Sequence, residues 1–423
     1  MVEQHIQTNI TDSLVPGLDF RGGVPSAEYV KGSKLVRWRA EAGDRFSQAA
    51  RQLRFRLVDD CWLQSGTVRL QVTLNNLAAG GQNGTDNPLQ PRTDPLGMFS
   101  SARLYMGGQL VEDIQELGVV SVMLDYFKPL NRRLNDSMQN HPLAANDDTR
   151  EPLRAGRGRK LIFELPFGML RQRLWLPLHL TSQLVIELTL GPAAQSLSGT
   201  ANTSSQFDLS DVSLLGTCMH VDSAISAGYH QHLDAGLPLP IPFQSLVVTK
   251  HVVTQPNFTL SLSRSLSRLK QIFFCLIRSN SAKVYEFTGK ADVNNLDDES
   301  DNMSFQVQIG SSKFPDGSPA EGVAEHHMRA MQALGKQLDH DDVALTPAVY
   351  LANKTIYAVD TERCGNEAAF QGISTRDGKV MTLTVNNAYA LDGTAANNIY
   401  NVIVVQVYDG IVNLRKGAID VSE

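Results

Sequence analysis

Cysteine is scarce in this chain of 423 residues, and its four copies stand far apart. None of them belongs to a CxxC pair, the spacing typical of zinc sites and redox motifs. Two of the four lie in apolar runs of strand character, where a cysteine behaves as a small buried hydrophobic residue. We therefore expect buried free thiols at Cys61, Cys218, Cys275 and Cys364.

Long hydrophobic runs are also missing. The longest, QIFFCLI and NVIVVQVYDGIV, have the length of a strand and fall well short of the roughly 20 residues that span a bilayer. The first residues, MVEQHIQTNITDSLVPG, contain neither the basic nor the apolar region of a signal peptide. These absences predict a soluble protein that is made in a reducing compartment and is not secreted.

Charged residues are few. They make up 19 % of the chain, against roughly 25 % in an average soluble protein. The net charge of −6 excludes a protein that binds nucleic acid through its overall charge. Asn, Ser, Thr, Gln and Gly fill the polar remainder, a composition typical of β-rich chains with long surface loops.

No motif for catalysis or for a metal is complete. The GxSxG of serine hydrolases is absent, and Gly289-Lys290 lacks the first glycine of a phosphate-binding loop. The acidic stretch 292–301 has Asp297 where a calcium loop needs glycine. We expect no enzyme, no cofactor and no metal site. His230 and His232 could bind a metal from one side of an extended segment, but no third ligand with suitable spacing follows. His326 and His327 point in different directions on a helix and are not a pair of i, i+4 ligands.

A pattern of strand, glycine turn and helix occurs twice, about 200 residues apart. Residues 103–127 read RLYMGGQLVEDIQELGVVSVMLDYF, and residues 305–334 read FQVQIGSSKFPDGSPAEGVAEHHMRAMQAL. In each copy an alternating strand enters a glycine turn, and a polar connection leads to a helix. We place these helices at about 113–127 and 322–335 and expect the apolar side of the first to pack on a sheet. An internal duplication, or two domains of one fold, leaves such a pattern.

The rest of the chain alternates with the period of strands, as in QLRFRLV and TVRLQVTL, and its length suits two domains. Nothing alternates β-α-β, which disfavours a parallel sheet. The sequence predicts an all-β fold of two tandem eight-stranded antiparallel jelly rolls, each with a short helix insertion. Closely spaced prolines oppose helices and central strands, so we assign 223–243 to the interdomain connection. The predicted organisation is an N-terminal arm and lead-in at 1–50, a first jelly roll at 51–222, a linker at 223–243 and a second jelly roll at 244–423.

Three stretches of this chain resemble the double jelly-roll major capsid proteins of double-stranded DNA viruses. That family includes the hexon of adenoviruses and the capsid proteins of tectiviruses, virophages and polinton-like viruses. The first jelly roll of the family carries a phrase that corresponds here to Leu165-Pro166-Phe167, then Leu176-Pro177-Leu178, then a strand at 184–190. The likeness covers nearly the whole chain and lies in the stretches 101–127, 163–191 and 368–414.

The resemblance implies a homotrimer that forms a pseudo-hexagonal capsomer in an icosahedral shell. It also implies a location in the virion after assembly inside the host cell. The implied partners are further copies of the chain, penton proteins and minor or cement capsid proteins, with no small-molecule substrate. A carbohydrate-binding or glycan-active β-sandwich is the alternative function, because jelly rolls also serve lectins. A cupin-like metal enzyme is a weaker alternative, because the histidines are dispersed.

Residues 31–56 are rich in basic side chains. On the inner face of a shell they would contact packaged DNA or an anionic inner membrane. A solvated strand face or ion pairs between subunits explains the same charges more simply, and we favour that interpretation. The loop RAGRGRK at 154–160 leaves the same two interpretations open. The candidate anion contacts are Lys31, Lys34, Arg37 and Arg39.

Overall fold

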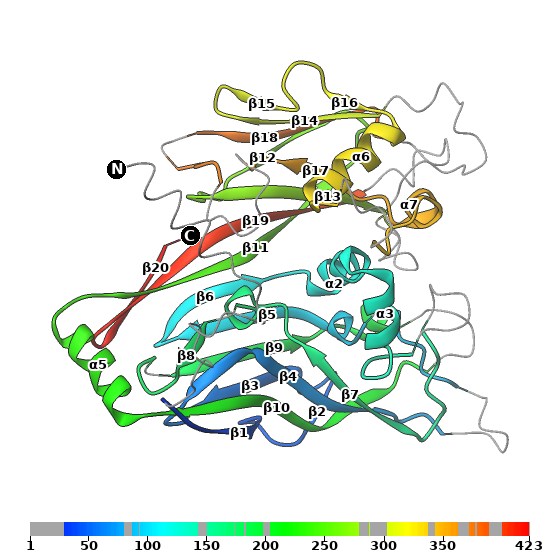
Figure 1. Cartoon of the computed structure of the whole chain (residues 1–423). Coiled ribbons are helices and arrows are strands. Elements are labelled where there is room, and N and C mark those ends of the chain that lie inside the picture. The colour runs from blue at the N-terminus through cyan, green and yellow to red at the C-terminus, as the bar shows by residue number, and fades with distance from the viewer. Residues whose placement is uncertain are drawn as a thin grey trace, which may run out of the picture.

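The computed structural model arranges the chain as four antiparallel sheets in two facing pairs (Figure 1). The residues that it describes are 29–79, 87–92, 94–142, 150–172, 174–181, 183–197, 204–278, 287, 303–336, 343–362, 372–376, 379–388 and 400–422. Within them, no helix is both long enough and apolar enough to cross a membrane.

The first pair of sheets forms the first jelly roll. One sheet has the strand order β1-β10-β4-β7, with β2 on β10 and β8 on β4, and the facing sheet has the order β3-β9-β5-β6. The strands are β1 (Val30–Arg39), β2 (Arg45–Ser47), β3 (Gln52–Leu57), β4 (Trp62–Asn76), β5 (Phe99–Met106), β6 (Gln109–Ile114), β7 (Gly158–Glu164), β8 (Trp175–Pro177), β9 (Leu184–Leu190) and β10 (Phe207–Val221).

The second pair forms the second jelly roll. Its sheets have the orders β11-β19-β13-β17, with β20 on β19, and β12-β18-β14-β15, with β16 on β14. The strands are β11 (Leu239–Val253), β12 (Phe258–Leu262), β13 (Leu269–Arg278), β14 (Ser304–Ile309), β15 (Ser312–Phe314), β16 (Ala320–Glu321), β17 (Tyr357–Asp360), β18 (Met381–Asn386), β19 (Tyr400–Arg415) and β20 (Ala418–Ser422).

The two jelly rolls have the same topology. In the first, β1 pairs with β10 in one sheet and β3 pairs with β9 in the other; in the second, β11 pairs with β19 and β12 pairs with β18 in the same places. The predicted class, all-β with two tandem jelly rolls, is therefore confirmed. Helices fill the ends and connections: η2 (Pro95–Met98), α2 (Leu117–Phe127), α3 (Leu130–Asp136), η3 (Gly168–Leu170), α4 (Ala193–Ser196), α5 (Ser223–Asp234), α6 (Val323–Ala333) and α7 (Pro347–Asn353).

The repeated sequence pattern marks equivalent elements of the two jelly rolls. Strand β5 turns through Gly107-Gly108 into β6 and then α2, and β14 turns through Gly310 into β15, β16 and then α6. Gly107 and Gly310 have φ of +55° and +61°, a left-handed conformation that favours glycine in tight hairpins. The first helix begins at Leu117, four residues later than predicted, because the residues before it complete β6.

Two segments differ from the sequence-based prediction. Residues 30–39, expected to lie in an irregular lead-in, form β1 along β10. The connection at 223–243 contains helix α5, which Asp222 caps through the backbone N–H of Ala224, and the first residues of β11. Its prolines follow the helix, and β11 is an edge strand, where a missing N–H leaves no ladder bond unmade.

The sheet β11-β19-β13-β17 is buried on both of its faces. Phe274 and Leu276 of β13 pack into the core of the second jelly roll, whereas Phe273 and Cys275 join the hydrophobic cluster that continues into the first. This two-sided burial explains why the sequence here reads as a continuous apolar run rather than an alternation. The sheet lies between the first jelly roll and the outermost sheet of the second (Figure 1).

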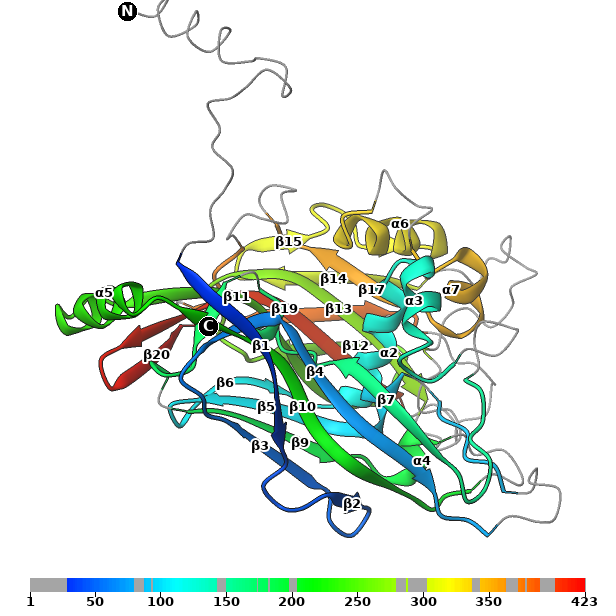
Figure 2. The ribbon, with the colours of Figure 1, turned by 60° about the horizontal axis from the view of Figure 1, so that its bottom comes forward.

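Helices gather at both ends of the block. In both views α2, α3, α6 and α7 lie at one end and α5 lies at the other (Figures 1 and 2). Under α2 and α3, Asp125 accepts hydrogen bonds from Arg133 at 2.9 Å and Arg150 at 2.7 Å. Burial alone would raise the pKa of Asp125, but Arg150, Lys128 and Arg133 together hold it below its usual value.

The pKa of Asp94, which lies beside Lys128, is shifted in the opposite direction from that of Asp125. Its carboxyl is 5 % exposed and lies 3.9 Å from the Lys128 ammonium. Burial raises its pKa to about 6, although Lys128 opposes the shift. The folded state therefore disfavours the ionised form, and this cost is absent below about pH 4 and fully present above about pH 6.

We predict that Asp94→Asn stabilises the protein at pH 7.5 by up to about 3 kcal/mol, because asparagine carries no buried charge. The gain should shrink between pH 6 and pH 4 and vanish below pH 4. Thermal unfolding of both proteins across this pH range measures it. The control is Asp136→Asn, which should change little because this carboxylate is only partly buried and its ion pair with Arg132 is at the surface. A variant less stable than the parent at pH 7.5 contradicts the prediction.

Candidate functional site

The junction between the two jelly rolls is built around one buried carboxylate. Glu112 on β6 is 1 % exposed. Its oxygens accept hydrogen bonds from the backbone N–H groups of Gly168 and Met169, at 2.9 and 2.8 Å, and from the Ser245 hydroxyl of β11 at 2.6 Å. Burial raises the pKa of Glu112, while these three donors oppose the shift. One side chain of the first jelly roll thus binds η3 and the first strand of the second.

The backbone of η3 lies directly against β11 beside this carboxylate. A Cβ added to Gly168 would lie 1.6 Å from the carbonyl oxygen of Gln244. Only glycine permits this approach, because the atom in the way belongs to backbone that cannot rotate aside. The phrase Leu165-Pro166-Phe167, which carries part of the family resemblance, leads into this contact and is itself buried.

Apolar side chains extend the junction away from Glu112. Phe127 of α2 and Phe273 of β13 have ring centroids 4.9 Å apart. A partly open groove of about 850 Å³ runs between the two jelly rolls there. At the rim, Lys250 and Glu116 form an ion pair of 3.0 Å across the junction. The junction therefore joins two sandwiches into one body with a hydrophobic interior.

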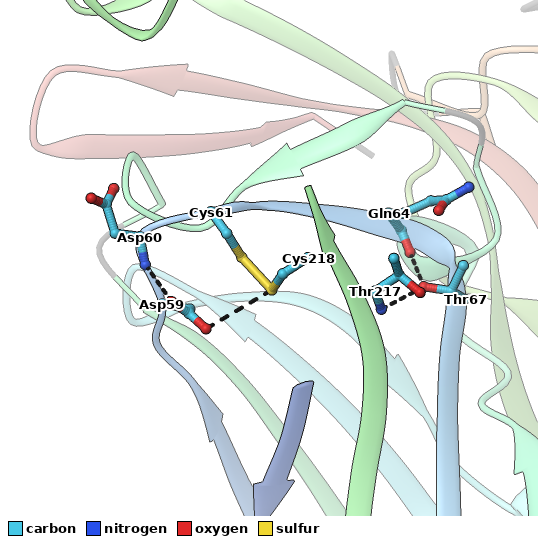
Figure 3. Close-up of a disulfide and its surroundings, with 7 residues drawn as sticks. All are labelled: Asp59, Asp60, Cys61, Gln64, Thr67, Thr217 and Cys218. Carbon is cyan, nitrogen blue, oxygen red and sulfur yellow. Dashed lines mark hydrogen bonds between the residues drawn. A yellow bond between two sulfur atoms is a disulfide. The ribbon is translucent and has the colours of Figure 1, made fainter. Parts of the chain in front are cut away.

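The structure corrects one prediction about the cysteines. Cys61 and Cys218, expected to be free thiols, form a disulfide whose Cα atoms are 5.6 Å apart (Figure 3). They are 157 residues apart in the chain, and the pairing of β10 with β4 brings them together. Cys275 is a buried free thiol, as expected, and burial raises its pKa. Cys364 lies outside the described residues.

The candidate anion contacts all lie on the edge strand β1. Lys31 pairs with Asp222 at 3.1 Å, and Arg37 donates a hydrogen bond to Gln71 at 3.4 Å. Lys34 and Arg39 are exposed. Further basic residues of 31–56 form ion pairs within the chain: Arg45 with Asp208, Arg54 with Glu41 and Glu187, and Arg56 with Glu41. These pairs are consistent with a solvated strand face, and a role in anion contact stays a prediction.

The RAGRGRK segment borders a hollow at the end of the first jelly roll. Arg154, Arg157 and Arg159 line it together with Glu151. Burial lowers the pKa of Arg159, and its guanidinium donates to the Glu151 carbonyl at 3.2 Å. The three arginines outnumber Glu151 and give the hollow a positive charge.

Metal ligands and glycan-binding features are sparse in the described part of the chain. The single group of three candidate ligands there is Asp59, Cys61 and Cys218, and the two cysteines are bonded to each other. The acidic stretch 292–301 and Gly289-Lys290 lie outside that part. The Phe, Tyr or Trp side chains described there with more than a third of their surface exposed are Tyr29 and Tyr229. A lectin would be expected to present more aromatic rings on a concave face.

Three histidines of the two pairs have neighbouring protein groups in the structure. His230 lies on α5, with its ring centroid 5.7 Å from that of His179. His326 is buried, with Nε2 3.2 Å from the Ala320 carbonyl oxygen, while His327 faces the ring of Tyr350. His326 and His327 therefore point in different directions, as the sequence predicted.

Two jelly rolls of equal topology, joined through a buried sheet, define the class of fold. Solved capsid-associated structures have the same fold. PBCV-1 VP54, fitted into a reconstruction of the virophage Sputnik, is similar with a TM-score of 0.67 at 12 % identity, over 96 % of this chain and 99 % of that one. The Faustovirus major capsid protein gives a TM-score of 0.62 at 8 % identity, over 96 % and 93 %.

The mavirus major capsid protein is also similar, with a TM-score of 0.51 at 10 % identity, over 97 % of this chain and 95 % of that one. At the level of sequence, no protein-family model matches the chain and no curated protein is similar to it. The likeness therefore lies in the fold, which matches from end to end.

We predict that Gly168→Ala separates the two jelly rolls. The new methyl group overlaps the backbone of Gln244, and a backbone shift of this size costs roughly 3 kcal/mol or more. Calorimetry should show one unfolding transition in the parent and two in the variant. Gly228→Ala is the matched control, because a Cβ there meets nothing within 4 Å. An unchanged single transition in Gly168→Ala contradicts the prediction.

Glu112→Gln should destabilise the junction although it keeps the shape of the side chain. Glutamine places an NH₂ group against donors that need an acceptor, and each buried donor left without one costs about 1–3 kcal/mol. Urea unfolding measures the loss. Glu164→Gln is the control, since its carboxylate is about a third exposed and pairs with Arg69 and Arg132; it should lose less than about 1 kcal/mol. An equal loss of unfolding free energy in the two variants would contradict the role of Glu112 in holding the junction.

Proposed function

We propose that this chain is a major capsid protein of a double-stranded DNA virus. The observation that carries the proposal is the fold: two tandem jelly rolls, matched over nearly the full length of this chain and of the Faustovirus and mavirus major capsid proteins. The similar solved structures are those of capsid proteins, which supports a structural role. The protein would be located in the virion after assembly inside the host cell.

Symmetry explains how two jelly rolls suit a shell. Three copies related by a three-fold axis present six sandwiches of similar shape, and a six-lobed block tiles a hexagonal lattice. The lobes keep their spacing only if each chain is rigid between them. The junction around Glu112, Gly168 and Ser245 supplies that rigidity, because its contacts are buried and specific.

The strands define the direction of the block. The longest strands, β4, β10, β11 and β19, contain 15 or 16 residues and run between the end that carries α5 and the end that carries α2 and α3 (Figure 1). Standing upright in a shell, such strands would put loops on the inner and outer surfaces and sheet faces on the sides. Neighbouring capsomers, penton proteins and minor or cement proteins would contact these surfaces.

Two finer assignments belong to the same proposal. One of them is the division into an arm, two jelly-roll domains and a linker, with the strands of the first domain beginning at Val30 and those of the second at Leu239. The other places Lys31, Lys34, Arg37 and Arg39 at the inner face, near packaged DNA or an inner membrane. The exposure of these side chains on an edge strand supports the second.

The purified protein should be a trimer. Light scattering coupled to gel filtration is expected to give three times the chain mass of 46.4 kDa over a wide concentration range, because obligate interfaces typically bury more than about 2,000 Å². Electron micrographs should show pseudo-hexagonal particles of one size. Gly168→Ala should lower the trimer fraction and Gly228→Ala should not. A protein that is monomeric at all concentrations would contradict the proposal.

A further inference from the structure

The Cys61–Cys218 link closes a long loop of the first jelly roll. Cys61 immediately precedes β4, and Cys218 lies near the end of β10. Their exposures are 2 % and 0 %. Strand β10 ends at Val221, and α5, the helix that leads to the second jelly roll, begins at Ser223. The link therefore lies where the chain leaves one sandwich for the other.

The sheet, rather than the sulfur–sulfur bond, places the two cysteines. Cys218 pairs with Leu63 of β4 on one side and with Lys34 of β1 on the other. The carbonyl of Cys61 accepts a hydrogen bond from the N–H of Leu178 at 3.1 Å. These backbone contacts hold the Cα atoms within the distance range of a disulfide whether or not the sulfurs are bonded. We therefore expect the fold to form without the bond.

We propose that Cys61 and Cys218 form a redox modification site that stiffens an already folded protein. The chain folds with both thiols reduced and is later oxidised by a low-molecular-weight disulfide. One cysteine thiolate attacks a sulfur of the oxidant and releases the first small thiol. The second cysteine thiolate then attacks the resulting mixed disulfide and releases the second. Two electrons pass from the cysteine pair to the oxidant, and the two cysteine protons end on the small thiols.

The bond has a mechanical consequence at the root of α5. Trp62, adjacent to Cys61, packs against Tyr229 of α5 with ring centroids 5.0 Å apart. Asp222, which caps α5, pairs with Lys31 of β1. Once Cys218 is tied to Cys61, the end of β10 cannot separate from β4, and α5 keeps its docking surface. The proposal does not depend on the capsid function.

Burial and charge make the exchange slow in the folded protein. Both sulfurs are shielded from solvent, so an oxidant or a reductant reaches them only after local opening. A carboxylate oxygen of Asp59 lies 4.0 Å from the Cys218 sulfur. Its negative charge disfavours the thiolate, the species that attacks in thiol–disulfide exchange. The bond should form slowly and, once formed, resist reduction.

The experiment starts from protein purified with a reductant and then transferred to oxidised glutathione. Intact mass should fall by two hydrogen atoms without retained glutathione, and peptide mapping should find Cys61 joined to Cys218. The Tm should rise by roughly 5–15 °C. Chymotrypsin should cleave at Tyr229 more slowly after oxidation. Asp59→Asn should close the bond several-fold faster, because the neighbouring charge is gone.

Matched variants separate this site from other effects of oxidation. Cys218→Ser should show no rise in Tm with oxidised glutathione, whereas Cys275→Ala should show the full rise. Three results would overturn the proposal: reduced protein that lacks native β structure, folded reduced protein that never closes the bond, or purified reduced protein that retains zinc through Asp59 and the two thiolates.

Discussion

Burial of the β11-β19-β13-β17 sheet on both faces is the constraint on which the rest of the structure depends. One face completes the core of the second jelly roll, and the other extends the core of the first. A sheet that is apolar on both sides is poorly specified by its own pattern, because shifting β13 by one residue merely exchanges Phe273 for Phe274. Hydrophobic burial supplies the stability of the junction but not its alignment.

Polar and steric contacts supply the alignment. Glu112 reaches Ser245 only when β11 lies in one register, and Gln244 fits against η3 only where Gly168 stands. A buried carboxylate without its donors would carry a large desolvation cost, so displaced arrangements are disfavoured. Two jelly rolls that slid along each other would lose both contacts at once. The alignment of the two jelly rolls thus comes from a few polar and backbone atoms within a large apolar surface.

Local patterns predicted what depends on local forces. Period-two alternation and the glycines of tight turns located strands such as β3 and the two strand–turn–helix copies, because side chains there face one core and one solvent side. Position in the sheet decided the rest. Pro240 and Pro242 fit β11 because it is an edge strand, and β1 escaped prediction because Val36 and Trp38 are its main inward side chains. The partners of Cys61, Cys218 and Glu112 are 56 to 157 residues away in the sequence. Local residue spacing cannot predict contacts between positions so far apart.

The duplicated topology also explains why the two halves of the chain have so few identical residues at equivalent positions. The sheets β1-β10-β4-β7 and β11-β19-β13-β17 are equivalent in strand order, yet the first forms the outer side of the block and the second lies inside it (Figure 1). The outward face of β4 therefore carries Arg69 and Thr73, while the corresponding face of β13 carries Phe273 and Cys275. Strands β5 and β14 keep a similar environment, with one face in a core, and there the repeat stays legible. Burial differs between the two copies and constrains which residue types each strand can carry. Strand order is the same in both copies and does not constrain residue type.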